Sequence, residues 1–498
     1  MKLVRILVVL AMMFAVSAVA YAETQSVKIS GDIAERAFAR SNYNLNHDQA
    51  ADTTVLAAGS GADSSHWGTF LQSTVEVQVD ADLTDNVGAV IRLLNQKAWG
   101  DNNYASSNNS ELGITGAPFT DQVANRQVAP GTNSFDVELD LAYIELKEFL
   151  YSPLTLKIGR QDLWFGRGFI VGANLQDNQG TLLAPEYTAV TSFDAIRATL
   201  DYDPWTIDAV YAKVRENFMQ SDDDVNLWGA NVGYVFENYN AEAEAYWWYK
   251  DQRFTGSSDG TLGTLASVIN GADSNEIHTV GGRGSFDPIE DWTVALESAY
   301  QFGQYVGINN AIDRRNRSAW SIDAMIECRY FQNQFAWKPV LGVEYIYYSG
   351  EEDMGDIVNA TNGTYTGWDP MYRGKFDTAI REWQNVFYRT NMTSSPAFTN
   401  QHQILVRGSV EPTESLTCSA TYGHFWLDQK WATQAVGAIP ENTKRNVGDE
   451  VDLKVDWDYT EDVTFSVLCG WFFPGDHFSS GQGNDVATDL VGSVKLSF

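Results

Sequence analysis

Seven basic residues are the strongest candidates for side chains that meet a solute. They are Arg36, Arg92, Arg160, Arg197, Arg283, Arg407 and Lys454. Arginine suits this task because its planar fork binds a carboxylate through two parallel hydrogen bonds. All of them except Arg36 and Arg160 lie opposite an apolar stripe and about four to six residues from a short polar turn. Side chains that share a face and a depth can form a belt of positive charge.

The other two bases fit this pattern less regularly. Arg36 lies on the polar face of its stretch but nearer the opposite end. Arg160 has the parity of the apolar positions between residues 154 and 158, so regular alternation would place it on the apolar face. It joins the belt only if Gly159 hosts a β-bulge, a common role of glycine within a strand.

Acidic residues supply an alternative interpretation for all of these bases. The chain carries carboxylates close to them, among them Asp194, Glu327, Asp452 and Asp456. Bases that neutralise such acids would hold neighbouring segments of the protein together rather than select a solute. The sequence gives equal weight to two roles for these bases, a belt that selects anions and a set of ion pairs that only holds the structure together.

Enzymatic chemistry finds no support in the chain. The six histidines form no HExxH motif, and no GxSxG motif occurs. Cys328, Cys418 and Cys469 form no CxxC pair, so no haem or zinc signature is present. We therefore predict no catalytic residue, no metal site and no cofactor. The 65 acidic against 33 basic residues also exclude nucleic acid as an expected partner.

Alternating stretches must position the bases. Residues 135–143, 241–250 and 450–458 place apolar and aromatic side chains at every second position and mostly charged ones between them. This period of two predicts strands whose faces differ in polarity. A dry core could not supply partners for so many charges, so the polar face must meet water.

Turn signals set the number of strands. Short polar breaks occur at 82–86, 150–153, 203–204, 237–240, 287–291, 332–334, 411–414 and 459–462. Longer polar segments lie between them, at about 41–67, 98–133, 163–190, 217–225, 253–275, 305–317, 350–400, 428–447 and 474–485. Eight short and nine long connections make 17, which predicts about 18 strands. We expect an all-β fold, a transmembrane antiparallel up-and-down β-barrel with short periplasmic turns and long extracellular loops.

Both ends of the chain agree with export to a membrane. Lys2 and Arg5 precede an apolar stretch that ends at Ala20-Tyr21-Ala22, the layout of a signal peptide over residues 1–22. Residues 23–498 then form a single barrel domain with a formal charge of −34, since Lys2 and Arg5 leave the −32 of the whole chain. The aromatic Phe498 ends an alternating stretch, which predicts a closing strand anchored at the membrane interface. Such an end resembles the signal that barrel-assembly machinery recognises.

Three stretches resemble the alginate-export family of bacterial outer-membrane porins. They are "KIGRQDLWFGRGFIVG" at 157–172, "FDTAIREWQNVFYR" at 376–389 and "VGDEVDLKVDWDYTEDVTFSVLCGWFFPGD" at 447–476. The resemblance covers nearly the whole mature chain and implies an 18-stranded barrel. It also implies passive passage of a polyanionic polysaccharide through a basic constriction. This chain differs in the many carboxylates on its polar faces.

We therefore expect an outer-membrane channel for an anionic polysaccharide or smaller anionic solutes. A cation-preferring general porin is the alternative, favoured by the acidic total, and a secreted carbohydrate-binding or carbohydrate-cleaving β-protein is another. Lipopolysaccharide and other outer-membrane lipid are the expected surroundings. The aromatic stretch 368–377 is expected either to fold into the pore, as a gate or a platform for sugars, or to pack as an ordinary loop.

Overall fold

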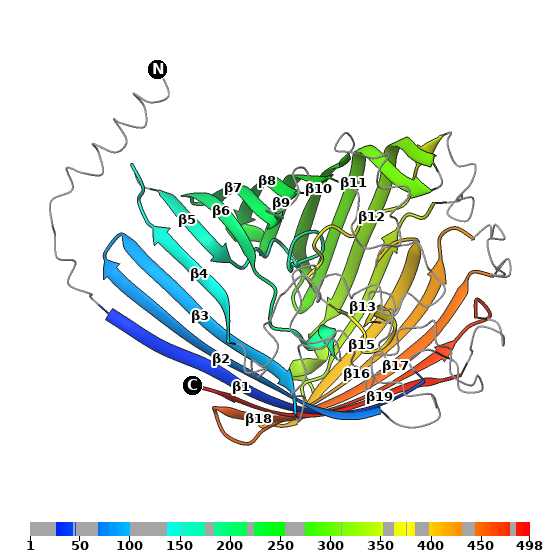
Figure 1. The fold of residues 1–498 in the computed structure, drawn as a ribbon. Coiled ribbons are helices and arrows are strands. Elements are labelled where there is room, and N and C mark those ends of the chain that lie inside the picture. Colours follow the sequence, from blue (N-terminus) through cyan, green and yellow to red (C-terminus); the bar gives the residue numbers. More distant parts are fainter. Residues whose placement is uncertain are drawn as a thin grey trace, which may run out of the picture.

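The chain forms one closed ring of tilted antiparallel strands (Figure 1). The computed structural model describes residues 26–42, 45, 68–99, 137–151, 153–174, 184–216, 224–253, 274–309, 311–351, 363–374, 376–383, 398–430, 444–478 and 485–498. The expected signal peptide lies outside these residues. Nineteen strands belong to the sheet, and one of them, β14 (Thr364–Tyr365), is a two-residue strand that runs parallel to β12. The other 18 make the wall, as the turn count predicted.

The wall strands follow one another in sequence order. The first nine are β1 (Ser26–Ser41), β2 (Gly68–Thr84), β3 (Val87–Ala98), β4 (Glu138–Leu146), β5 (Leu154–Gln161), β6 (Phe193–Tyr202), β7 (Trp205–Arg215), β8 (Val225–Phe236) and β9 (Ala241–Arg253). The remaining nine are β10 (Ser274–Ile289), β11 (Trp292–Asn309), β12 (Ala311–Cys328), β13 (Val340–Tyr348), β15 (Gln401–Thr413), β16 (Leu416–Leu427), β17 (Asn446–Asp458), β18 (Val463–Pro474) and β19 (Ala487–Ser497). Short helical turns also occur, at η2 (Pro185–Tyr187), η3 (Glu237–Tyr239), η5 (Tyr330–Asn333) and α3 (Arg381–Trp383). Among the described residues, no helix combines the length and apolar character needed to cross a bilayer.

Eight short connections gather at one rim of the barrel, and each contains or adjoins one of the predicted turns. The prediction of a loop at 305–317 is wrong. Strands β11 and β12 stay paired through this segment, up to Asn309↔Ala311. The segment is polar enough to suggest a loop. Antiparallel pairing nevertheless provides backbone hydrogen-bond partners for these polar residues.

The wall is apolar outside and polar inside. Ile91 and Leu93 are 48% and 43% exposed, and Leu341 and Val343 are exposed on the same outer surface. Glu344, next to Val343, is 1% exposed because its side chain points into the ring. This arrangement is the reverse of a soluble protein and matches a barrel that meets lipid. The alternation seen in the sequence therefore records which residues meet the membrane.

The first and last strands close the ring. Strands β1 and β19 pair from Asp32↔Ser497 to Ser41↔Thr488. Beyond them, the backbone N–H groups of Phe498 and Gly31 donate to each other's carbonyl oxygens at 3.0 Å. A Cβ atom on Gly31 would lie 2.8 Å from Cζ of Phe498, so the missing side chain leaves room for the terminal ring. Closure removes the sheet edge that lipid could not tolerate.

Two connections fold back into the barrel. We call residues 162–174, after β5, the first inward segment, and residues 363–383, after β13, the second inward segment. Their backbones bond to each other, since Gly172 N–H donates to Tyr372 O at 2.7 Å and Gly374 N–H to Gly168 O at 2.9 Å. A Cβ atom on Gly172 would lie 2.8 Å from Cα of Gly374, so only a glycine permits this approach. The two segments thus form one layer inside the wall.

Candidate functional site

The inner wall carries six of the seven bases singled out from the sequence. Arg92 lies between the outward residues Ile91 and Leu93, and Arg197 follows the outward residue Ile196. Arg407 and Lys454 likewise follow outward apolar neighbours. The inward members are Arg36, Arg92, Arg197, Arg283, Arg407 and Lys454.

Arg160 lies on the outer face instead. It pairs in register with Asp194, and its Nη1 lies 3.6 Å from the Oδ2 of that residue. Asp194 shares the outward face of Ile196, whereas the buried Gln161 points inward. Pairing of β4 with β5 continues without a shift through Gly159, so the bulge that would have turned Arg160 inward does not form. The prediction that Arg160 lines the lumen is therefore wrong, and the regular parity of its strand explains why.

The first inward segment lies along the wall from β6 to β13. The ring of Phe165 lies 4.8 Å from the Arg197 guanidinium and packs edge-on against Trp248 of β9. Two residues later, Arg167 reaches Asp323 of β12 at 3.1 Å and also pairs with Glu344 of β13. Phe169, Ile170 and Val171 are buried in the apolar core inside the barrel. Apolar packing thus carries Arg167 to the far side of the ring.

The second inward segment continues this layer to β17. Its short helix α3 leaves N–H groups without partners in the helix, as every helix start does. The Ile380 N–H donates to Glu450 Oε1 at 2.6 Å, and the Arg381 N–H donates to Glu450 Oε2 at 2.8 Å. The Ala379 N–H donates to Asp452 Oδ2 at 3.1 Å. Two wall carboxylates therefore hold this segment in place.

A chain of alternating charges crosses the layer. Glu344 pairs with both Arg167 and Arg407, and the Oδ1 of Asp377 accepts from Arg407 Nη2 at 2.8 Å. Asp377 also pairs with Arg373, whose Nη2 lies 3.4 Å from Glu382 Oε1. Burial lowers the pKa of Arg373, but the neighbouring Tyr348, Asp377 and Glu382 outweigh this effect and keep the pKa above its ordinary value. The network ties both segments to β13 and β15.

The partners in these ion pairs differ in exposure. The side chain of Arg92 is 18% exposed and that of Asp140 is 0%. For Arg197 and Asp208 the values are 25% and 3%, and for Arg407 and Glu344 they are 31% and 1%. The carboxylates lie against the wall, and the guanidinium groups cover them. The surface met by a solute at these places is therefore the arginine.

Two other bases do not follow this pattern. Arg283 is 10% exposed and pairs at 2.5 Å with Glu242, which is 46% exposed. Lys454 lies 3.0 Å from Asp456, and both side chains are partly exposed. At these places the lumen presents mixed charge.

The wall near β1 holds an arginine whose contacts differ from those of the other bases. Arg36 Nη1 donates to Thr74 Oγ1 at 3.0 Å, and its guanidinium lies 5.2 Å from the ring of Tyr187 in η2. Among the described residues, no carboxylate lies within ion-pair distance of Arg36. Burial raises the pKa of Tyr187, so this phenol stays neutral beside the arginine. Arg36 thus keeps a full positive charge on the inner wall.

Sequence reasoning missed the charges supplied by the inward segments. Arg167, Arg373, Asp377 and Glu382 all lie in connections, where strand parity gives no information. A usable signal was the apolar content of "LWFGRGFIVG", residues 163–172, since a solvated loop has no reason to carry so many apolar residues.

The stretch 368–377 does fold inward, as one of its two expected outcomes stated. Trp368 and Tyr372 are each 2% exposed, so their rings belong to the internal core and offer no stacking platform. Within the described part of the chain, no group of three His, Cys, Asp or Glu side chains could hold a metal ion.

Comparisons with known proteins give a family and a fold. A family model described as "Alginate export" matches residues 35–491. The outer membrane protein opdK of Pseudomonas aeruginosa superimposes with a TM-score of 0.50 at 10% identity, over 95% of this chain and 100% of that chain. OccK11 (OpdR) of the same organism superimposes with a TM-score of 0.50 at 11% identity, over 95% of this chain and 96% of that chain. OccAB4 of Acinetobacter baumannii superimposes with a TM-score of 0.50 at 10% identity, over 96% of this chain and 100% of that chain. No curated protein matches the chain.

Proposed function

The chain belongs to the alginate-export family, and from this premise we propose that it passes anionic saccharides or smaller carboxylate-bearing solutes across the outer membrane. It is an outer-membrane β-barrel of porin type, and its family and structural neighbours are channels. The selectivity of such a channel depends on the charges that line its narrow part. The proposal concerns those charges.

The observation that carries the proposal is the unequal exposure of the ion pairs. Arg92, Arg197 and Arg407 face the lumen, and each is held by a buried carboxylate, although Arg92 also pairs with the exposed Asp162 at 3.4 Å. A solute carboxylate at the wall meets guanidinium donors first, at a short distance and in a medium less polarisable than bulk water. Charges on the outer rim are screened beyond about 8 Å at physiological salt. The formal −34 of the mature chain therefore does not set the preference of the constriction.

The same pairs keep solute binding weak. Each arginine already shares its donors with an acid of the protein, so a passing carboxylate gains only part of a charge-assisted hydrogen bond. Conduction needs this balance, because a solute must enter readily and also leave. Several weak binding sites along the wall, each an arginine already paired with an acid, allow faster passage than one site that binds the solute tightly.

A specific observation favours a second candidate, a cation-preferring general porin. Asp162 and Glu242 are 45% and 46% exposed on the lumen side, and Lys454 is matched by Asp456. If such acids dominate the narrow part, cations will pass more readily than anions.

Neutralising two wall arginines tests the proposal. Arg197→Gln with Arg407→Gln should shift the reversal potential in a salt gradient toward cations. It should also weaken block by an anionic oligosaccharide by about tenfold, the equivalent of about 1.4 kcal/mol. Arg329→Gln with Lys338→Gln is the matched control, since both side chains lie exposed at the short-turn rim. Unchanged potential and block in the arginine variant would mean that these bases only brace the wall.

A further inference from the structure

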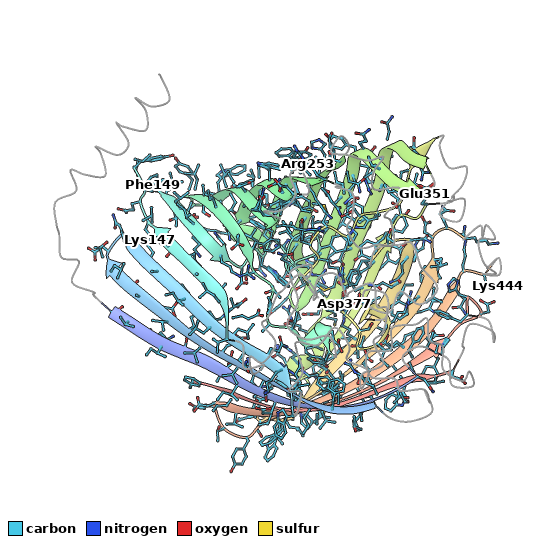
Figure 2. The ribbon with its side chains drawn as sticks, in the orientation of Figure 1. Lys147, Phe149, Arg253, Glu351, Asp377 and Lys444 are labelled. Atoms are coloured by element: carbon cyan, nitrogen blue, oxygen red, sulfur yellow. The ribbon has the colours of Figure 1, made fainter. Side chains whose placement is uncertain are left out.

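We infer that Asp377 is a built-in competitor for the anion site at Arg407, a tethered carboxylate that a permeating carboxylate must displace. The inference rests on the proposed function and adds a specificity-determining residue to it. Asp377 lies near the middle of the barrel, away from Lys147 and Phe149 at one rim and Lys444 at the other (Figure 2).

Arg407 holds two carboxylates of different origin. Its Nη1 pairs with Glu344, a residue of the wall strand β13 that is 1% exposed. Its Nη2 donates to Asp377 Oδ1 at 2.8 Å, and Asp377 comes from the second inward segment. Each acid has a second guanidinium, Arg167 for Glu344 and Arg373 for Asp377, but Glu344 is part of the wall strand β13 whereas Asp377 belongs to a connection. Asp377 is therefore the exchangeable partner.

The carboxylate of Asp377 can separate from Arg407 at a small cost in free energy, because it keeps its ion pair with Arg373. Its Oδ2 pairs with Arg373, which is 3% exposed and lies in the same segment. A buried carboxylate that loses every partner is strongly destabilising, but this one keeps a guanidinium after Arg407 turns away. The displaced state is thus within reach of a modest binding free energy.

The rest of the segment stays attached during such an exchange. The N–H groups of Ala379, Ile380 and Arg381 bind the β17 carboxylates, and the Thr378 N–H donates to Glu382 Oε2 at 3.2 Å. The Asp377 N–H also donates to Glu382, and none of these anchors involves the carboxylate of Asp377. The exchange is therefore a side-chain movement rather than an unfolding of the segment.

The exposed donor belongs to Arg407. Its side chain is 31% exposed against 4% for Asp377, so a solute reaches the guanidinium from the lumen. A solute carboxylate and Asp377 have the same chemistry and compete for the same Nη2–H donor. Solutes without a carboxylate gain nothing by the exchange, so the competitor favours acidic sugars over neutral ones.

Single-channel recording of the full chain tests the inference with galacturonate as the probe. Asp377→Asn removes the competitor and should lower the half-blocking concentration of galacturonate by about five- to tenfold, within the usual range for coupled sites. Asp456→Asn removes one lumen carboxylate beside Lys454 and should change the block much less. In the Arg407→Gln background, Asp377→Asn should give no gain, because the site it frees is absent.

The outcomes separate the inference from the proposed function. A wild-type reversal potential that favours cations would overturn the proposed function, whatever the variants do. Anion preference with equal block in Asp377→Asn and Asp456→Asn would overturn the competitor alone. Heat-modifiable mobility establishes that each variant is folded, and Asp377→Ser provides a second removal of the same charge with the same expected gain.

Discussion

The effect of a lumen-facing base in this barrel depends on the residues that it contacts. Arg197 and Arg407 are held at the lumen by acids that are themselves buried, so a net acidic protein presents basic groups at particular places. Arg36 lies on the same wall in contact with Thr74 and the Tyr187 ring, and no carboxylate of the described residues pairs with it. Electrostatics at this scale depends on exposure and distance rather than on totals.

Ionisation of Glu382 should make the anion preference of the channel depend on pH. Burial, and next the charge of Asp377, raise its pKa to about 7 from an ordinary value of 4.5. Its carboxyl therefore ionises as the pH rises from about 6 to 8 and adds one negative charge beside Arg373. We expect anion preference to fall across this range, with a midpoint near 7. Because the pKa in the folded state is raised, the stability contributed by the neutral carboxyl is complete below about 4.5, its ordinary pKa, and is lost as the pH rises from there to about 7.

Reversal potentials recorded at several pH values check this expectation. Glu382→Gln keeps a neutral side chain of nearly the same shape and should reduce the step near pH 7. A step of equal size in the variant would assign the titration to another group.

Strands and connections obey different rules in this molecule. The sequence of each wall strand alternates because every second residue meets lipid. This alternation continues along β19 to Phe498. Connections follow no such period, so polar residues at 305–317 extend a hairpin while apolar residues at 163–172 pack inside the ring. Composition alone therefore takes a polar strand segment for a loop and gives no reliable account of an apolar connection.

The closing strand supplies a prediction at this scale. Phe498→Ala with Leu496→Ser removes the ring that lies over Gly31 and one apolar position of the lipid face of β19. Each lost apolar burial costs about 1.5–3 kcal/mol, and the free edge becomes harder to seal. We expect much less heat-modifiable barrel in outer-membrane fractions. Wild-type amounts would mean that neither side chain contributes to assembly.

The whole molecule is a ring lined on one side by its own connections. The outward apolar surface, together with the family match, sets aside the secreted soluble β-protein considered from the sequence. The two inward segments cover the wall from β6 to β17, and Arg36 and Arg92 lie on the part of the wall near β1 and β3. The charges that meet a solute therefore come from both wall and connections.

Closure can be tested by a cross-link between the first and last strands. Ser41 and Thr488 are register partners at the outer end of β1 and β19, and such partners lie close enough for a disulfide. In a background without Cys328, Cys418 and Cys469, Ser41→Cys with Thr488→Cys should oxidise readily and change the gel mobility of the denatured chain. Ser41→Cys with Gln429→Cys, several strands away, should not. A failure of the first pair alongside folded protein would contradict this register.

Local rules in the sequence determined the barrel itself. Alternation in stretches such as 450–458 has a period of two whatever the partner strand, and turn residues such as Asp203-Pro204 mark connections by their own geometry. Strand number, the two rims and the inward side of Arg92, Arg197 and Arg407 follow from those local rules. Export and the membrane-facing end at Phe498 are expectations of the same local kind.

Only the tertiary structure decided what each charge meets. Arg167 and Glu344 are 177 positions apart, and Arg407 and Asp377 come from a strand and a connection, so their contacts depend on stagger and closure. Arg160 shows the same limit, because its side of the wall depended on whether a bulge formed at Gly159, and unbroken pairing with β4 settled that. The burial of Asp140, Asp208 and Glu344 behind their arginines is also a property of the closed ring. Parity is local, whereas contact and exposure belong to the assembled wall.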